Sequence, residues 1–165
     1  MSVFEALVAL AEPWSARYSE STTLSVGLTF AHLGAMMVGG GLAIAADRQL
    51  LRAGTPVAAA ERSALADALH DVHRPVVIAL LVSAISGGLQ LAADLEALAA
   101  NRIMWGKGAL LLALLVNGLL MLRNEAAVRR DGGVAATFRS LRARALTSIV
   151  LWLAIVLAGT GLMQG

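Results

Sequence analysis

The sequence predicts an all-α fold, an integral membrane bundle of four antiparallel transmembrane helices. Of the 165 residues, 58% are hydrophobic and 15% are charged, whereas a soluble domain has about 45–50% apolar and about 25% charged residues. Four stretches are largely apolar over about 20 residues, the length of helix that crosses about 30 Å of hydrocarbon. A water-soluble globular domain is therefore disfavoured. A disordered chain is excluded, because such chains are poor in apolar residues.

Residues 1–20 are expected to form an N-terminal amphipathic helix that rests on the outer membrane interface. One face of this helix would be apolar, and it consists of Phe4, Leu7, Val8 and Ala11. The other face carries Glu5 and Glu12, in a region where a signal peptide would have basic residues. The alternative to an interfacial helix is a frayed terminal tail.

Residues 21–165 are expected to form a single four-helix transmembrane domain. The second span should start after Pro75, because the first turn of a helix tolerates a proline without its N–H. The four predicted spans cover residues 24–46, 76–93, 103–122 and 145–163.

The two long connections between spans contain further helical signals. In the first, Thr55-Pro56 resembles a helix cap followed by a first-turn proline, which predicts a cytoplasmic amphipathic helix along the membrane or over the bundle. In the second, Asp131-Gly132-Gly133 predicts a break. The segment 137–144 then reads as a helical lead into the fourth span.

The distribution of Lys and Arg orients the chain, because cytoplasmic loops carry an excess of both. Loops 47–74 and 123–144 hold Arg48, Arg52, Arg62, Arg74, Arg123, Arg129, Arg130, Arg139, Arg142 and Arg144, and the other side holds only Arg17, Arg102 and Lys107. We therefore expect a protein of the cytoplasmic (inner) membrane, with both loops cytoplasmic and both termini outside.

The expected partners follow from charge and from small residues. Anionic lipids would interact with Arg139, Arg142 and Arg144, each contributing about 1 kcal/mol near a headgroup, unless these residues serve only to set topology. Nucleic acid is not an expected partner, since the net charge is only +2. Small residues recur every four positions in the first span and predict close helix packing, within the bundle, with a membrane-protein partner or in a homo-oligomer. They are Gly27, Ala31, Ala35, Gly39 and Ala43.

Two ionisable residues fall inside the predicted spans, where such residues are costly and usually functional. His32 lies ten residues past Thr22, which is about 15 Å at a rise of 1.5 Å per residue. It could be a neutral imidazole bonded to a Ser, an Asn or a carbonyl of another helix, a ligand of haem iron or another metal, or part of a proton relay. Lys107 is close enough to the end of its span to extend its ammonium to the interface.

A haem bound by His32 would need a second ligand at similar depth. His70 and His73 are about 20 Å away in depth, so the candidates are Lys107, Met36 and Met104. A copper site could instead combine His32 with Met36 and Met37. His70, His73 and Asp71 are either a surface metal site or simply solvated, and Asn124 and Glu125 are expected to pair locally.

Several function classes are excluded by what the sequence lacks. There is no cysteine, which removes disulfides, cysteine-ligated metals and a cysteine nucleophile. There is also no phosphate-binding loop and no hydrolase or zinc-protease motif. We do not expect a stand-alone enzyme.

Two segments resemble known membrane families. The first-span FAHLGAMMVGGGLAIAADR and the third-span WGKGALLLALLVNG are similar to small helical proteins related to the copper-resistance CopD family, and to HemJ-type protoporphyrinogen oxidases. In HemJ-type proteins a first-span His and a third-span Lys are implicated in haem binding. The resemblance therefore implies His32 and Lys107 as cofactor-binding residues. An uncharacterised family with the same four-span plan is an equal alternative.

Three functions are consistent with these observations. The first is a b-type haem-binding redox subunit, with His32 as axial ligand and Lys107 as second ligand or haem-propionate partner. The second is a copper-handling or small-solute transport protein that uses His32, Met36 and Met37. The third is an accessory subunit that packs its small-residue stripe against a larger membrane complex.

Overall fold

The computed structural model describes residues 2–53, 58–130 and 135–162, and almost all of them are helical. The helices are α1 (Val3–Glu20), α2 (Thr22–Arg52), α3 (Ala59–Ala93), α4 (Leu95–Ala100), α5 (Arg102–Arg130) and α6 (Ala135–Leu162). Among these, α2, α3, α5 and α6 are long and apolar enough to cross a membrane. The prediction of an all-α chain with four helices that are long and apolar enough to span a membrane is confirmed.

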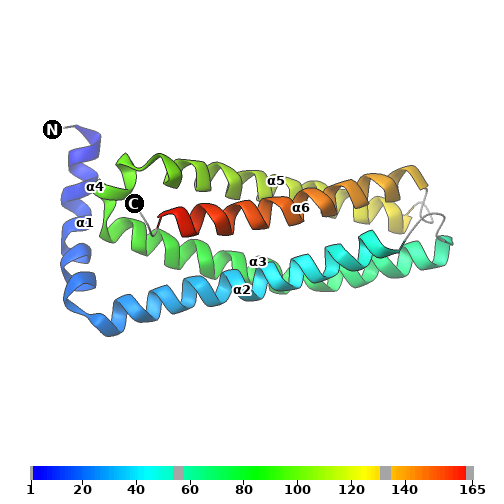
Figure 1. Cartoon of the computed structure of the whole chain (residues 1–165), viewed down its shortest axis with the longest axis horizontal. Coiled ribbons are helices and arrows are strands. Elements are labelled where there is room, and N and C mark those ends of the chain that lie inside the picture. Colours follow the sequence, from blue (N-terminus) through cyan, green and yellow to red (C-terminus); the bar gives the residue numbers. More distant parts are fainter. Residues whose placement is uncertain (1, 54–57, 131–134, 163–165) are drawn as a thin grey trace.

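The four long helices form two antiparallel pairs (Figure 1). Helix α2 packs along α3 and α5 packs along α6, while α6 also contacts α2 and α3 also contacts α5. One end of the bundle lies next to α1, and we call it the α1 end. At the opposite end α2 and α5 finish and α3 and α6 start, and we call it the Arg-rich end.

The helices extend well beyond the predicted spans. Most of residues 47–74 and 123–144 lies in α2, α3, α5 and α6 rather than in loops. The predicted amphipathic helix is the first part of α3, which continues through Pro75, so this proline lies inside the helix and not at its start. Hydropathy marks only the part of a helix that is apolar all round, whereas an amphipathic extension buries one face against its neighbours. Thr55-Pro56 and the predicted break at 131–133 lie outside the described residues.

Two buried clusters show where the helices pack most closely. Leu114, Trp152 and Ile155 form a small cluster in the middle of the bundle. A larger cluster fills the Arg-rich end and draws on all four long helices, with Leu50, Ala66, Leu69, Met121, Val128, Phe138, Leu141 and Ala145. Large apolar side chains such as Phe30 and Leu157 are exposed on the outside, as expected of surfaces that face lipid tails.

Glycines allow close approach in the second half of the predicted small-residue stripe. A Cβ added at Gly39 would lie 2.9 Å from Cβ of Ala79 on α3, and one at Gly40 would lie 3.1 Å from the Trp152 ring on α6. At Gly27 a Cβ would meet nothing within 4 Å. The stripe therefore packs inside the bundle around Gly39, and its role in binding a partner through Gly27, Ala31 and Ala35 stays a prediction.

Polar bonds attach the helix ends to one another. Arg142 donates from its guanidinium to the Leu51 carbonyl at the end of α2 (2.9 Å), so this predicted lipid contact already serves one of the terminal carbonyls that a helix leaves unpaired. Asn117 donates to the Arg144 carbonyl (3.0 Å) and links α5 to α6. Lipid binding by Arg139, Arg142 and Arg144 stays a prediction.

Helix α1 lies across one end of the bundle instead of along it (Figure 1). Its start is closed by a capping box, in which Ser2 and Glu5 bond to each other's backbone N–H. The Trp14 indole donates to the Leu89 carbonyl and the Ser15 hydroxyl donates to the Ala93 carbonyl, each at 2.7 Å. The helical prediction for residues 1–20 therefore agrees with the structure over Val3–Glu20.

Candidate functional site

A cavity of about 370 Å³ lies between α2, α3, α5 and α6. Most of its wall is apolar, and it includes Leu80, Leu114, Met121 and Trp152. The wall also contains Val77, Leu115 and Leu119, which are exposed on the outside of the bundle. The cavity is therefore open sideways, between α3 and α5, towards the region that lipid would occupy.

Three polar side chains line this apolar cavity, namely Asp47, His73 and Ser148. Asp47 is only 2% exposed, because α2 continues beyond the predicted end of the first span and turns this residue to the same side as Ala43 and Leu50. The Ser148 hydroxyl is within hydrogen-bonding reach of the carboxylate. The Oδ2 atom of Asp47, by contrast, has no hydrogen-bond partner among the described residues. A buried, incompletely paired carboxylate is costly, so it must bind a proton or a ligand, or remain as a destabilising feature.

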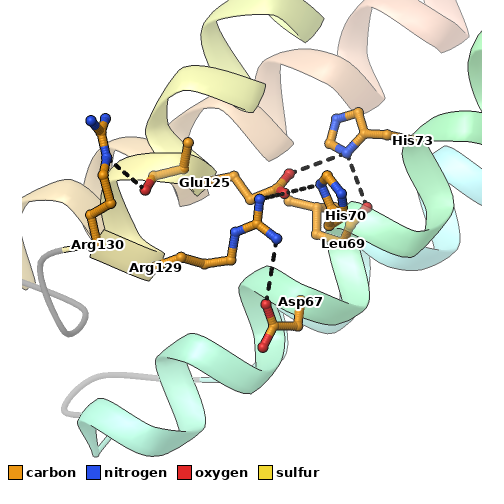
Figure 2. Close-up of polar contacts among 8 residues, drawn as sticks. Asp67, Leu69, His70, His73, Glu125, Arg129 and Arg130 are labelled. Atoms are coloured by element: carbon orange, nitrogen blue, oxygen red, sulfur yellow. Dashed lines mark hydrogen bonds and ion pairs between the residues drawn. The ribbon is translucent and has the colours of Figure 1, made fainter.

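A second ionisable group lies next to the cavity at the Arg-rich end. Glu125 of α5 is fully buried, with its Oε1 2.8 Å from Nδ1 of His70 and its Oε2 3.2 Å from Nδ1 of His73. Arg129, one turn further along α5, lies 3.8 Å from Glu125 and 3.7 Å from Asp67 of α3. Figure 2 shows these side chains converging from the two helices.

His73 connects this cluster to the cavity. Its Nδ1 lies 3.0 Å from the Leu69 carbonyl oxygen, and since a carbonyl can only accept, Nδ1 donates there. The ring also lines the cavity and is close enough to Asp47 for the two groups to interact electrostatically. A series of ionisable groups therefore runs from Asp47 through His73 and Glu125 to His70, whose side chain is 51% exposed. Histidines and carboxylates in such a series can pass protons, because imidazole accepts and releases them near neutral pH.

His32 is bonded to the neighbouring helix. Its Nδ1 lies 2.9 Å from the Ser83 carbonyl oxygen and 3.4 Å from the Ser86 hydroxyl. The ring lies over Gly87, where a Cβ would be 2.9 Å from its Cε1. This is the arrangement expected of an imidazole bonded to a serine or carbonyl of another helix. The same Nδ1 bond would orient Nε2 if the ring held a metal.

The structure brings together some of the other predicted site residues and separates others. Lys107 is close enough to His32 to interact with it electrostatically, and its Nζ would lie 3.6 Å from a Cβ at Gly159 of α6. Met36 packs against the central cluster, whereas Met37 is 78% exposed on the outside. Neither this cavity nor a smaller one between α2 and α3 is lined by His32, Lys107 or Met36.

No group of three or more His, Asp or Glu side chains suited to hold a metal ion occurs in the described part of the chain. Asp71, which the surface-metal interpretation combined with His70 and His73, is exposed, and both histidines contact Glu125 instead. Asn124 donates to the Ser140 hydroxyl of α6 (2.9 Å). Glu125 contacts His70 and His73 of α3, in addition to its local contact with Arg129 of α5. The expected local pairing of Asn124 and Glu125 is thus only part of what the structure shows.

Sequence reasoning missed Asp47 and Glu125 as site residues, although a periodic signal was present. The buried positions of α5 are Leu114, Asn117, Met121, Glu125 and Val128, which follow the spacing of three and four residues of one helical face. Extending that face past the end of the apolar segment would have placed Glu125 inside the bundle. The contact with His70 and His73 depends on the packing of α3 on α5, which spacing does not define.

No protein-family model, no curated protein and no solved structure matches this chain.

Proposed function

We propose that this protein binds a small amphipathic cation in the Asp47 cavity and acts as a membrane transport protein for such solutes. The observation that carries the proposal is the buried Asp47 carboxylate, whose Oδ2 has no hydrogen-bond partner among the described residues and which lines an otherwise apolar cavity. A cation that enters the cavity would supply the missing partner, and its apolar body would contact the wall.

The size and lining of the cavity support a small organic ligand. Its volume of about 370 Å³ is within the range of about 300–1,000 Å³ typical of small-molecule sites. The indole of Trp152 forms part of the wall, and an aromatic face attracts a cation. An inorganic ion would bind Asp47 but would make no favourable contact with the apolar side chains that form most of the wall.

The sideways opening supports entry from the bilayer. Val77 of α3 and Leu115 and Leu119 of α5 line the opening and are exposed, so a ligand dissolved in lipid would meet apolar side chains before it reaches Asp47. The Glu125 cluster lies at the Arg-rich end of the bundle, and the excess of Arg there supports a cytoplasmic location for this cluster.

Binding of tetraphenylphosphonium to the purified protein in lipid nanodiscs tests this proposal. Tetraphenylborate has nearly the same shape and the opposite charge, so it controls for simple apolar partitioning. We expect the cation to bind and Asp47→Asn to weaken its binding by about tenfold or more, which corresponds to about 1.4 kcal/mol. The matched control is Asp71→Asn, which removes an exposed carboxylate of α3 and should leave binding unchanged. Equal binding of the two ions, or full affinity in Asp47→Asn, would contradict the proposal.

Haem binding remains a second candidate, supported by the Nδ1 bond that orients His32 and by the proximity of Lys107. An absorption spectrum of protein produced with ample haem tests it directly. A Soret band that is lost in His32→Ala would support the haem site, and the absence of any Soret band would remove it.

A further inference from the structure

We propose that cation binding at Asp47 is coupled to the release of a proton, which leaves the bundle through His73, Glu125 and His70. This inference rests on the proposed function and names the proton as the coupling ion of the same site. It is carried by the arrangement of four side chains between the cavity and the surface of the Arg-rich end.

The inner end of this path is the cavity. Asp47 from α2 and His73 from α3 both line it, and they are close enough to interact electrostatically. When the cavity is empty, a proton on the carboxyl group removes the uncompensated charge of Asp47. When a cation enters, its charge replaces that of the proton, so the proton must move to a neighbouring base. His73 is a titratable side chain in that wall.

The middle of the path crosses from α3 to α5 and back. Nδ1 of His73 lies 3.2 Å from Oε2 of Glu125, and Oε1 of the same carboxylate lies 2.8 Å from Nδ1 of His70. The two oxygens of Glu125 thus face two different histidines, as Figure 2 shows. The Nδ1–H of His73 donates to the Leu69 carbonyl, and Oε2 of Glu125 accepts no hydrogen bond from the described residues. This N–H must therefore shift from the carbonyl towards Oε2 before Glu125 can take its proton and pass one to His70.

The outer end of the path is His70, which is about half exposed and can exchange its proton with water. Each step transfers one proton, and no electron is gained or lost. The Asp47 carboxyl gives its proton to the His73 ring, His73 gives one to Glu125, Glu125 gives it to His70, and His70 releases it. The bound cation then neutralises Asp47, so the net charge of the cavity is unchanged.

Two further charged groups, Arg129 and Asp67, form ion pairs beside Glu125. Arg129 of α5 attracts Glu125 at 3.8 Å and Asp67 at 3.7 Å, and α6 contributes the Ser148 hydroxyl beside Asp47. A cluster of this kind could instead serve only to hold α3 against α5, in which case cation binding would release no proton. The two roles therefore differ in a measurable quantity.

The test measures cation binding and proton release in the same sample. Protein in nanodiscs is mixed with tetraphenylphosphonium in weakly buffered solution that contains a pH indicator, and bound cation is measured separately by equilibrium dialysis. We expect about one proton released per bound cation where Asp47 is protonated beforehand. Glu125→Gln and His70→Asn should keep cation binding and slow proton release by about tenfold or more, since each removes a positioned proton-transfer group.

Two comparisons keep the outcomes separate. His70 is about half exposed, so His70→Asn tests the path even if Glu125→Gln does not fold. The control Asp71→Asn should release protons as wild type does. Cation binding without proton release, or release at the wild-type rate in both path variants, would overturn the proton path and leave the proposed function standing. A wild-type protein that binds no cation would overturn both.

Discussion

Polar side chains inside the bundle find their bonding partners differently at its two ends. At the α1 end, His32 is held by one neighbouring helix, through the Ser83 carbonyl and two serine hydroxyls. At the Arg-rich end, ionisable side chains of α2, α3 and α5 meet next to the large apolar cluster. The first arrangement satisfies a single polar group, whereas the second links several of them to one another and to the surface.

The difference follows from the surroundings of each end. Between lipid tails, burying one apolar side chain against another gains little, so helices associate through close backbone approach and hydrogen bonds. Where the helices extend beyond their apolar segments, side chains such as Phe138 and Leu141 are fully buried, as large apolar side chains are in the core of a soluble protein. Ionisable groups are therefore concentrated at the end that is built more like a soluble protein.

The largest expected effect is a loss of unfolding free energy when the apolar cluster of the Arg-rich end is disrupted. Phe138 is 1% exposed, and Phe138→Ala should lower the free energy of unfolding by about 3–5 kcal/mol, because it leaves a cavity. The matched control is Phe30→Ala at the α1 end, since Phe30 is 77% exposed. Unfolding in mixed micelles with increasing denaturing detergent measures both. Equal losses in the two variants would contradict the comparison.

A smaller effect is expected from the close contact between α2 and α3. Gly39→Leu places side-chain atoms where a Cβ alone would already lie 2.9 Å from Ala79, and the overpacking should cost about 1–3 kcal/mol of unfolding free energy. Gly27→Leu in the same helix has open space around it and should be tolerated. The same detergent titration measures both variants. If Gly27→Leu were the more disruptive, the first half of the stripe would have to pack against another molecule.

The hydrogen bonds of α1 should contribute less again. Trp14→Phe removes the indole donor to the Leu89 carbonyl and should weaken the attachment of α1 by about 1 kcal/mol. Hydrogen exchange of the α1 amides reports this directly, as faster exchange. Ser19→Ala is the control, because the Ser19 hydroxyl donates within α1, to the Ala16 carbonyl. Unchanged exchange in Trp14→Phe would show that α1 is held by other contacts.

The smallest effect is expected at the surface of the Arg-rich end. Asp67 is 63% exposed and pairs with Arg129 at 3.7 Å, and Asp67→Asn should change the free energy of unfolding by less than about 0.5 kcal/mol. The change should shrink further in high salt, because exposed charges are screened. A loss of several kcal/mol would mean that the Glu125 cluster depends on its outermost member.

The sequence was sufficient for the fold class and for the four helices that are long and apolar enough to span a membrane, because such helices require long apolar stretches. The sequence also marked His32 as an ionisable residue inside an apolar stretch, and one of its expected arrangements, a bond to a carbonyl of another helix, is present. Its role as a ligand stays a prediction. The sequence did not reveal Asp47 or Glu125, since both lie at or beyond the ends of those stretches, where a charged residue usually reaches water. Their burial depends on how the helix extensions pack, and hydropathy carries no information about that packing.

Pro75 makes α3 easier to bend beside the cavity. Proline has no backbone N–H, so α3 lacks the hydrogen bond that would reach back to the Asp71 carbonyl. The residues on either side of this gap, His73 and Val77, both line the cavity, and Val77 lies at its opening. Helices bend most readily where the backbone ladder is interrupted. A bend of α3 at this interrupted turn would therefore change the width of the sideways opening.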